Sequence, residues 1–303
     1  MDAFIQYVLP ALCGIAIGIL SGLLGVGGGT IMVPMFRLLF GMSAIGSTAT
    51  SLFTIIPTSI SGAVTHIRNK TLYLKLGLLL GIGGACTSPL GVWLASKSPS
   101  WAVMLAAALI IGYSAISMLG KAIKMSPAKT NKGKAATSSE EGAVETETET
   151  ETETETETET ETETETETET ETAFSIELDR HKICTGIVIG LLAGLLSGYV
   201  GVGGGFIMVP LMIAFIGVPM KMASGTSLVA VMLVAIAGVV EHAMMGNIDY
   251  LAGVIVALGS IPGAIIGAKL VKVIPERTLR FLFGGFLVVA ALLLVLNEFQ
   301  VLG

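Results

Sequence analysis

The sequence predicts an all-α polytopic membrane protein of two inverted repeats, each a broken or re-entrant glycine-loop helical hairpin plus three transmembrane helices. The first observation is composition: 52% of the 303 residues are hydrophobic and 13% are charged, where a soluble protein carries roughly 25% charged residues. The second is that the apolar residues gather in long uninterrupted segments. The third is that the two halves of the chain repeat one another, including a glycine-rich motif in each.

The apolar segments set the expected number of helices. A hydrocarbon core about 30 Å thick is crossed by roughly 20 residues of helix. Segments of about this length occur eight times, at 4–24, 43–66, 72–95, 101–120, 183–200, 222–243, 250–271 and 278–297. Two shorter apolar pieces, 30–41 and 206–217, follow the glycine runs and are too short to cross alone.

The halves align at an offset of 176 residues. Thirteen of the 17 positions in Gly18–Pro34 are identical to those in Gly194–Pro210. The Thr-Ser pairs that follow the hairpins, and the histidines His66 and His242, keep the same offset. Glycine-rich membrane segments match one another easily, whereas histidine at a fixed offset does not, so we interpret the match as an internal duplication.

The duplication divides the chain into membrane repeat 1 at 1–120, a linker at 121–181 and membrane repeat 2 at 182–303. Residues 145–172 are Glu-Thr pairs that hold 14 of the 23 acidic residues. Such a tract buries too little apolar surface to fold, so we expect a disordered cytoplasmic linker. The formal charge of −6 therefore describes this tract and indicates no nucleic-acid partner or charged binding surface.

Basic residues favour cytoplasmic loops and thereby predict the orientation. They gather in the central linker and in two short connections, at Arg68, Lys70 and Lys75 and at Lys272, Arg277 and Arg280. All three connections fall on one side if each glycine-loop hairpin makes no net crossing, and both termini then lie outside. Arg37 and Lys97 are exceptions to this pattern. The charges thus favour inverted repeats with broken elements near the midplane, in the cytoplasmic membrane.

The glycine loops are the principal candidate for a binding site. Glycine destabilises helices but permits positive φ and close approach of the backbone to a ligand. Irregular backbone at membrane depth survives where protein or a water cavity satisfies it, and helix N-termini attract anions. We therefore expect an anion to bind the loops; close helix packing through small residues is the alternative. The loop residues are Gly25, Gly27, Gly28, Gly29, Gly201, Gly203, Gly204 and Gly205.

Hydroxyl and titratable side chains extend the candidate site. Hydroxyls can donate to an oxyanion or bond their own helix, and the candidates are Ser21, Thr50, Ser51, Ser197, Thr226 and Ser227. Ionisable groups at the ends of membrane helices are candidates for coupling or gating, with plain interfacial placement as the alternative. These are His66, Glu241 and His242.

The duplicated pattern G-x-x-S-G-x-x-G-V-G-G-G-x-x-x-V-P, at Gly18–Pro34 and Gly194–Pro210, resembles that of the TauE/SafE sulfite exporter family. The resemblance covers both halves, and the long Glu-Thr insert departs from the family pattern. It implies movement of small anions, notably sulfite and organosulfonates, across the cytoplasmic membrane. Its implied partners are a small anionic substrate, the lipid bilayer and a coupling proton or ion.

These features favour a secondary transporter that works by alternating access, with an anion-selective channel as the alternative. An enzyme is not expected, because the chain has no H-E-x-x-H motif and no convincing pairing of serine with histidine. We expect no cofactor and no metal site. The anion, the direction of transport and the oligomeric state stay open at this stage.

Overall fold

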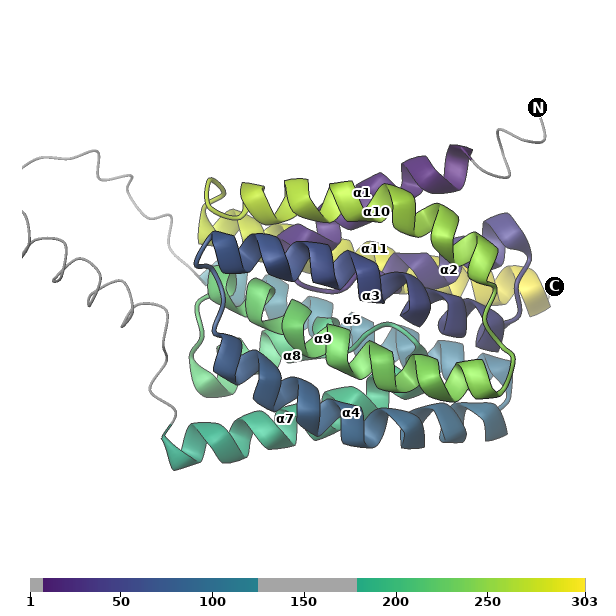
Figure 1. The fold of residues 1–303 in the computed structure, drawn as a ribbon, viewed down its shortest axis with the longest axis horizontal. Coiled ribbons are helices and arrows are strands. Elements are labelled where there is room, and N and C mark those ends of the chain that lie inside the picture. The colour runs from purple at the N-terminus through teal and green to yellow at the C-terminus, as the bar shows by residue number, and fades with distance from the viewer. Residues whose placement is uncertain (1–7, 125–178, 303) are drawn as a thin grey trace, which may run out of the picture. The chain divides into compact units, whose positions relative to one another are not determined.

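The computed structural model describes residues 8–124 and 179–302, and this part of the chain is helical apart from short loops (Figure 1). Most of the predicted linker, 125–178, lies outside the described residues. The helices flanking it extend past the predicted boundaries at 120 and 182, because one continues to Lys124 and the next begins at Arg180.

Ten α-helices and one π-helical segment make up the described residues. The first repeat contains α1 (Leu9–Leu24), α2 (Gly29–Phe40), α3 (Ala44–Arg68), α4 (Leu74–Lys97) and α5 (Ser100–Lys124). The second repeat contains α7 (Arg180–Val200), α8 (Gly205–Leu211), the π-helical segment η2 (Met212–Ile216), α9 (Met220–Met244), α10 (Tyr250–Leu270) and α11 (Glu276–Leu302).

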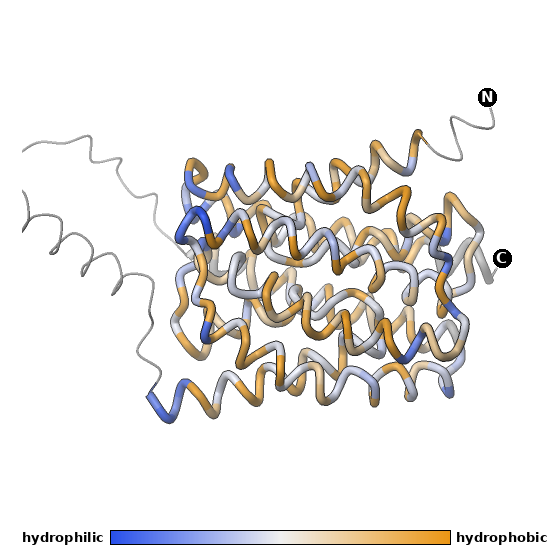
Figure 2. The backbone as a smooth tube through the Cα atoms, in the orientation of Figure 1, coloured by the Kyte–Doolittle hydropathy of each residue, from blue (hydrophilic) through white to orange (hydrophobic). Residues whose placement is uncertain are grey.

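Length and apolarity identify a polytopic membrane protein. Five described segments, in α4, α5, α7, α9 and α10, are long and apolar enough to cross a membrane. The helices α3 and α11 have 25 and 27 residues, and α1, α2 and α8 with η2 are shorter and apolar. Large apolar side chains are exposed on the outer faces, for example Leu109, Tyr113 and Ile116. Figure 2 shows hydrophobic residues along the helices and the most hydrophilic ones at their ends, as lipid contact requires.

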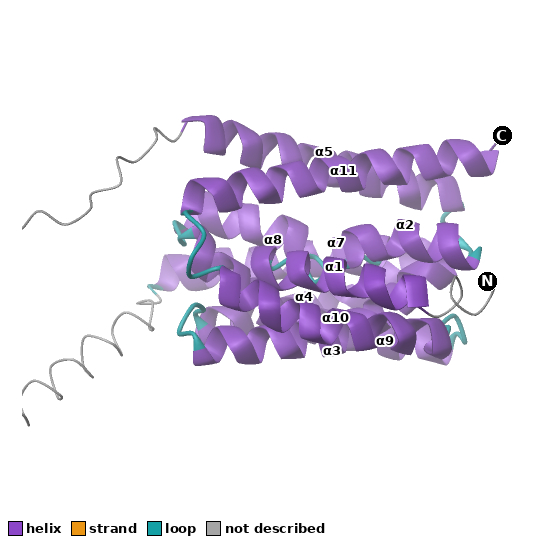
Figure 3. Ribbon diagram, turned by 90° about the horizontal axis from the view of Figure 1, so that it is seen from above, coloured by secondary structure: helices purple, strands orange, loops and turns teal. Residues whose placement is uncertain are grey.

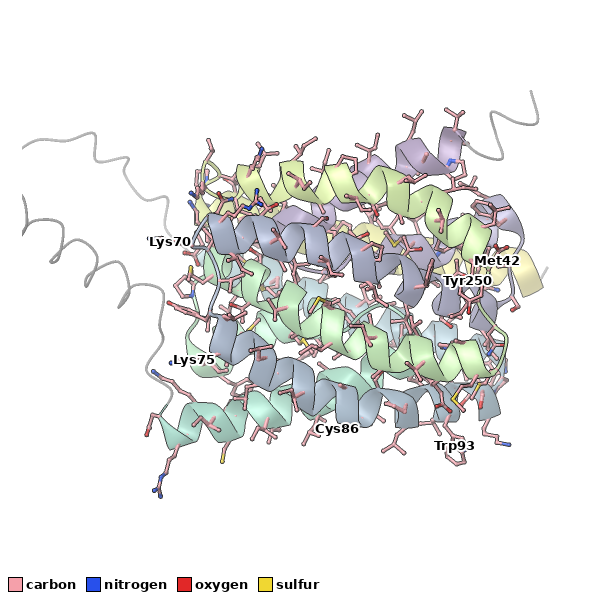
Figure 4. The ribbon with its side chains drawn as sticks, viewed as in Figure 1. Met42, Lys70, Lys75, Cys86, Trp93 and Tyr250 are labelled. Carbon is pink, nitrogen blue, oxygen red and sulfur yellow. The ribbon has the colours of Figure 1, made fainter. Side chains whose placement is uncertain are left out.

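The two glycine-loop hairpins approach the interior from opposite ends of the bundle (Figures 1 and 3). Helix α1 runs inward and α2 returns to the end from which α1 came; α7 and α8 do the same at the other end. The remaining helices of one repeat run opposite to their counterparts in the other. Figure 4 places Lys70 and Lys75 at one end of the bundle, and Met42, Trp93 and Tyr250 at the opposite end.

Each hairpin packs on the other repeat through a row of small residues. On α10, the Cβ atom of any larger residue placed at Gly259, Gly263 or Gly267 would overlap the backbone of α1. A carbon added at Gly190 or Gly194 of α7 would likewise overlap the backbone of α4. The glycine row on α10, G-x-x-x-G-x-x-x-G, therefore serves helix packing as its spacing predicts, and the two repeats are interlocked.

Candidate functional site

The first glycine loop is a break between two helices that only glycine can form. Helix α1 ends where Gly25 takes a left-handed conformation (φ 74°) and its N–H bonds the Ser21 carbonyl at 2.8 Å. Gly27 (φ 80°) and Gly28 (φ 86°) continue in positive φ, and α2 begins at Gly29. Residues with a Cβ avoid this conformation, so the run of glycines is a backbone requirement.

The second loop repeats the geometry from the opposite end of the bundle. Gly201 (φ 74°) ends α7, and its N–H bonds the Ser197 carbonyl at 2.7 Å. Gly203 (φ 85°) and Gly204 (φ 72°) follow, and α8 begins at Gly205. The duplicated sequence thus forms the same broken helix twice.

The two loops meet backbone to backbone. A carbon added at Gly29 would lie 2.6 Å from the Val202 carbonyl oxygen, and one added at Gly205 would lie 2.9 Å from the Val26 Cα. Val26 and Val202 are fully buried. The sequence predicted two loops, and the structure brings them into one site in the interior.

The start of a helix lies on each side of this contact. Ile31 and Met32 donate to the Gly28 carbonyl at 3.3 and 3.1 Å, and Ile207 and Met208 donate to the Gly204 carbonyl at 3.1 and 3.0 Å. The first N–H groups of any helix have no acceptor within that helix, and those of α2 and α8 lie at the loops. Helix N-termini carry partial positive charge. Two of them converge here, an arrangement that suits an anion.

The wall opposite the loops is formed by α3 and α9, through two apolar residues that were not among the predicted site residues. Ile55 lies 3.3 Å from a carbon added at Gly27 and 3.0 Å from one added at Gly203. Val231 lies 2.7 and 3.2 Å from the same two positions. Ile55 and Val231 are separated by 176 residues and each follows the serine of a Thr-Ser pair by one helical turn. That spacing was the available signal, since residues four apart share a helix face.

Several buried hydroxyls around the loops have no hydrogen-bond partner within the described residues. They include the predicted candidates Ser21 and Ser197 beside the loops and Ser51 one helical turn before Ile55, each fully buried. Thr30 and Ser59 share this property and were not predicted. Buried polar groups are normally paired, so these hydroxyls are free to bond a ligand.

Ser227 differs from its counterpart Ser51, because its hydroxyl lies 2.7 Å from the Gly25 carbonyl and 2.8 Å from the Ser224 carbonyl and shares its one proton between them. It therefore ties α9 to the first glycine loop. A carbon added at Gly201, the equivalent loop position, would overlap the side chain of Thr48. The matching serine-to-loop bond is not formed at Ser51.

Thr50 and Thr226 stabilise the fold. The Thr50 hydroxyl accepts a bond from the Asp249 N–H at 3.1 Å, and Thr226 accepts one from the Tyr73 N–H at 2.8 Å. The first bond joins α3 to the residue that precedes α10, and the second joins α9 to the residue that precedes α4. Each hydroxyl oxygen therefore accepts a bond that joins the two repeats, and this bond does not use the hydroxyl's own proton.

The two histidines are buried but differ in their bonds. His66 Nε2 lies 2.9 Å from the Gly22 carbonyl and Nδ1 lies 2.7 Å from the Thr71 hydroxyl. Because a carbonyl only accepts, Nε2 carries the proton and pairs an otherwise open carbonyl near the end of α1. Within the described residues His242 has no partner for either ring nitrogen. Glu241 precedes it and is half-buried.

The site is uncharged and closed to solvent. The loop glycines, Ile55 and Val231 are buried, as are the serines around them. Among the described residues no group of three or more His, Cys, Asp or Glu side chains could hold a metal ion. Backbone N–H groups and hydroxyls therefore supply the polar contacts that this centre offers.

These features define a multi-pass membrane protein with two broken-helix hairpins meeting at an internal site. The family model described as sulfite exporter TauE/SafE matches residues 10–294, and the chain belongs to this family of membrane transporters. It is 27% identical over 274 residues to the probable membrane transporter protein YunE of Bacillus subtilis, covering 88% of this chain and 87% of the relative.

A second relative is the probable membrane transporter protein YdhB of the same organism, 26% identical over 266 residues, with 87% of this chain and 90% of the relative covered. No solved structure matches the chain. Membership in a transporter family, and not in a family of enzymes, agrees with the expectation from the sequence.

Proposed function

We propose that the chain is a secondary transporter of small oxyanions, of the sulfite or organosulfonate type, which works by alternating access. The observation that carries the proposal is the meeting of two glycine loops with two helix N-termini in a buried, uncharged centre. The family description, sulfite exporter, supports the sulfur-containing class of substrate.

The anion would be bound mainly by the backbone. The N–H groups at the starts of α2 and α8 would donate to its oxygens, and the hydroxyls of Ser21, Ser51 and Ser197 would add further donors. Ile55 and Val231 would exclude water on the opposite side. Such a site stabilises a negative charge through dipoles and hydrogen bonds, while the lack of a fixed countercharge lets the anion leave again.

The inverted-repeat topology supports this mechanism. The hairpins enter from opposite ends, and matching helices run in opposite directions (Figure 1). The end that carries Lys70 and Lys75 also carries the starts of α9 and α11, where Lys221 donates to the Lys272 carbonyl. Because basic residues favour the cytoplasm, we assign this end to the cytoplasmic side and both termini to the outside.

Contacts that differ between the two repeats support alternating access. The end of α1 is held by His66 and Ser227, which bond the Gly22 and Gly25 carbonyls. The equivalent residues at the end of α7, His242 and Ser51, have no such bonds among the described residues. We infer that the histidines act as gating residues, and that the opposite state of the transporter exchanges the two sets of contacts. His242, with Glu241 beside it, is our candidate for proton coupling.

Flux into proteoliposomes tests the proposal. Purified protein should exchange labelled sulfite or a short organosulfonate across the bilayer, with saturation and counterflow. Replacement of Gly28 by alanine adds a carbon 2.9 Å from Ile17 in a positive-φ position, and should abolish exchange. Gly112→Ala, where an added carbon meets nothing within 4 Å, is the control. Exchange that survives at the wild-type rate in the loop variant would remove the loops from the mechanism.

Electrical recording separates the carrier from a channel. A carrier gives no unitary currents, and the solvent-excluded centre supports a carrier. Resolved single-channel steps would establish an anion-selective channel instead. The topology has its own test, since a reporter that works only in the cytoplasm should be inactive after Gly303. An active reporter would overturn the inverted-repeat assignment.

A further inference from the structure

The structure contains an apolar groove between the first glycine-loop hairpin and α11. Its volume is about 420 Å³ and its lining is apolar apart from the threonine at its mouth. The principal lining residues are Leu20 of α1, Ile31 of α2, and Thr278, Phe281, Gly285 and Val289 of α11. Phe281 and Val289 are exposed on the outer surface, so the groove opens towards the surrounding lipid.

The length of the groove corresponds to one leaflet. Thr278 and Val289 mark its ends along α11, and at 1.5 Å per residue they are separated by roughly 16 Å. A bilayer core is about 30 Å thick, so one leaflet spans about 15 Å. An acyl chain lying along α11 from its first turn would therefore fill the groove.

One basic residue, Arg277, lies beside the groove. The Arg277 guanidinium lies 5.7 Å above the ring of Phe281, which lines the groove. Arg280 is neutralised by Glu276 at 2.6 Å. Lys221 donates to the backbone carbonyl of Lys272 at 3.0 Å, and a carbonyl brings no countercharge. Arg277 thus places a positive charge beside an apolar groove, at the end of the bundle where α9 and α11 begin.

The positive charge beside the groove is specific to one repeat. At the offset of 176 residues, the positions of Lys272, Arg277 and Arg280 are occupied by Ser96, Trp101 and Met104. The fold itself therefore does not require cations there. Guanidinium groups match the geometry of phosphate oxygens, and anionic headgroups favour basic residues at the cytoplasmic surface.

We propose that this groove binds an anionic phospholipid, with an acyl chain along α11 and its phosphodiester at Arg277. The inference rests on the membrane placement of the helices and not on the identity of the transported anion. Leu20 and Ile31 flank the first glycine loop in sequence, so the bound chain would contact the hairpin that has to move. Lipid occupancy would then influence how readily that hairpin changes state.

Native mass spectrometry of the purified full-length protein tests the site, with phosphatidylglycerol and phosphatidylcholine of identical chains as probes. Arg277→Gln should lower retention of phosphatidylglycerol at least tenfold and lower that of phosphatidylcholine much less, because the choline cation of phosphatidylcholine already compensates its phosphodiester. Gly285→Leu should displace both lipids, because a carbon added at Gly285 meets nothing within 4 Å and its side chain would occupy the groove.

Two matched variants serve as controls. Arg68→Gln removes an exposed charge at the end of α3, and Gly112→Leu adds a side chain at an open position of α5; both should retain wild-type lipid. If Gly285→Leu is not monodisperse, Thr278→Trp at the exposed mouth replaces it. Equal retention of the two lipids by the wild type, unchanged retention in Gly285→Leu or Thr278→Trp, or displacement of the lipid by inorganic phosphate alone would overturn the proposal.

Discussion

The sharpest test of the proposed anion site is Ser51→Ala. The Ser51 hydroxyl is fully buried on the face of α3 that also carries Ile55, and it has no hydrogen-bond partner within the described residues. An unpaired buried polar group costs about 1–3 kcal/mol. Alanine at this position should therefore leave the folded protein as stable as the wild type, or more stable.

Its effect on transport should be large. A hydrogen bond to a charged group contributes about 1.5–3 kcal/mol. Every 1.4 kcal/mol is a factor of ten in affinity, so the loss corresponds to roughly a 10- to 150-fold higher half-saturation concentration. The combination of unchanged stability with weaker substrate binding separates a ligand contact from a packing role.

Counterflow in proteoliposomes gives the half-saturation concentration, and thermal unfolding in detergent gives the stability of the same preparation. Ser88→Ala is the matched control, since Ser88 is also buried and unpartnered but lies beside Gly238 of α9. Ser227→Ala is the converse, and should lower stability because its bond to the Gly25 carbonyl is lost. An unchanged half-saturation concentration in Ser51→Ala, or an equal change in Ser88→Ala, would refute the reasoning.

Three further predictions follow from the same contacts. His66→Ala should lower the free energy of unfolding by about 1–3 kcal/mol because it leaves a buried carbonyl unpaired. His242→Ala should change the free energy of unfolding little. Thermal unfolding compares the two variants, and equal losses would contradict the assigned contacts. Gly263→Leu should prevent recovery of monodisperse protein, because its side chain overlaps the α1 backbone, while Gly112→Leu should elute normally. Thr226→Val should lower the unfolding free energy by about 1 kcal/mol without raising the half-saturation concentration; a transport defect at unchanged stability would instead make it a substrate contact.

The broken helices could be predicted because their cause is local. Gly28 and Gly204 each lie in a run of glycines that no helix favours, and each run is followed by an apolar piece too short to cross a membrane. Both glycines have positive φ in the structure, a conformation that glycine adopts easily and other residues avoid. Because the two halves share this sequence, both loops are expected to have the same geometry.

The parts that escaped prediction depend on contacts between the repeats. Thr50 is predicted as a ligand contact from its place in a Thr-Ser pair, but the pair gives no sign that its oxygen also accepts from Asp249, 199 residues away. Ile55 and Val231 carry no chemical signal in an apolar segment, and become part of the site only because both loops lie against them. The spacing of apolar residues along the sequence does not indicate which helix of the other repeat packs against a given residue.

The difference between the two repeats is the feature most closely tied to mechanism. Ser51 and Ser227 occupy equivalent positions, so the chemistry that forms the Ser227–Gly25 bond is present at both. If the opposite state forms this bond at Ser51 in place of Ser227, each state gains one bond of about 1 kcal/mol, and the exchange would be nearly balanced. States separated by so little are both populated, and a ligand needs only a modest preference to shift them. We infer that duplication makes the two states of the transporter nearly equal in energy, and that the substrate then decides between them.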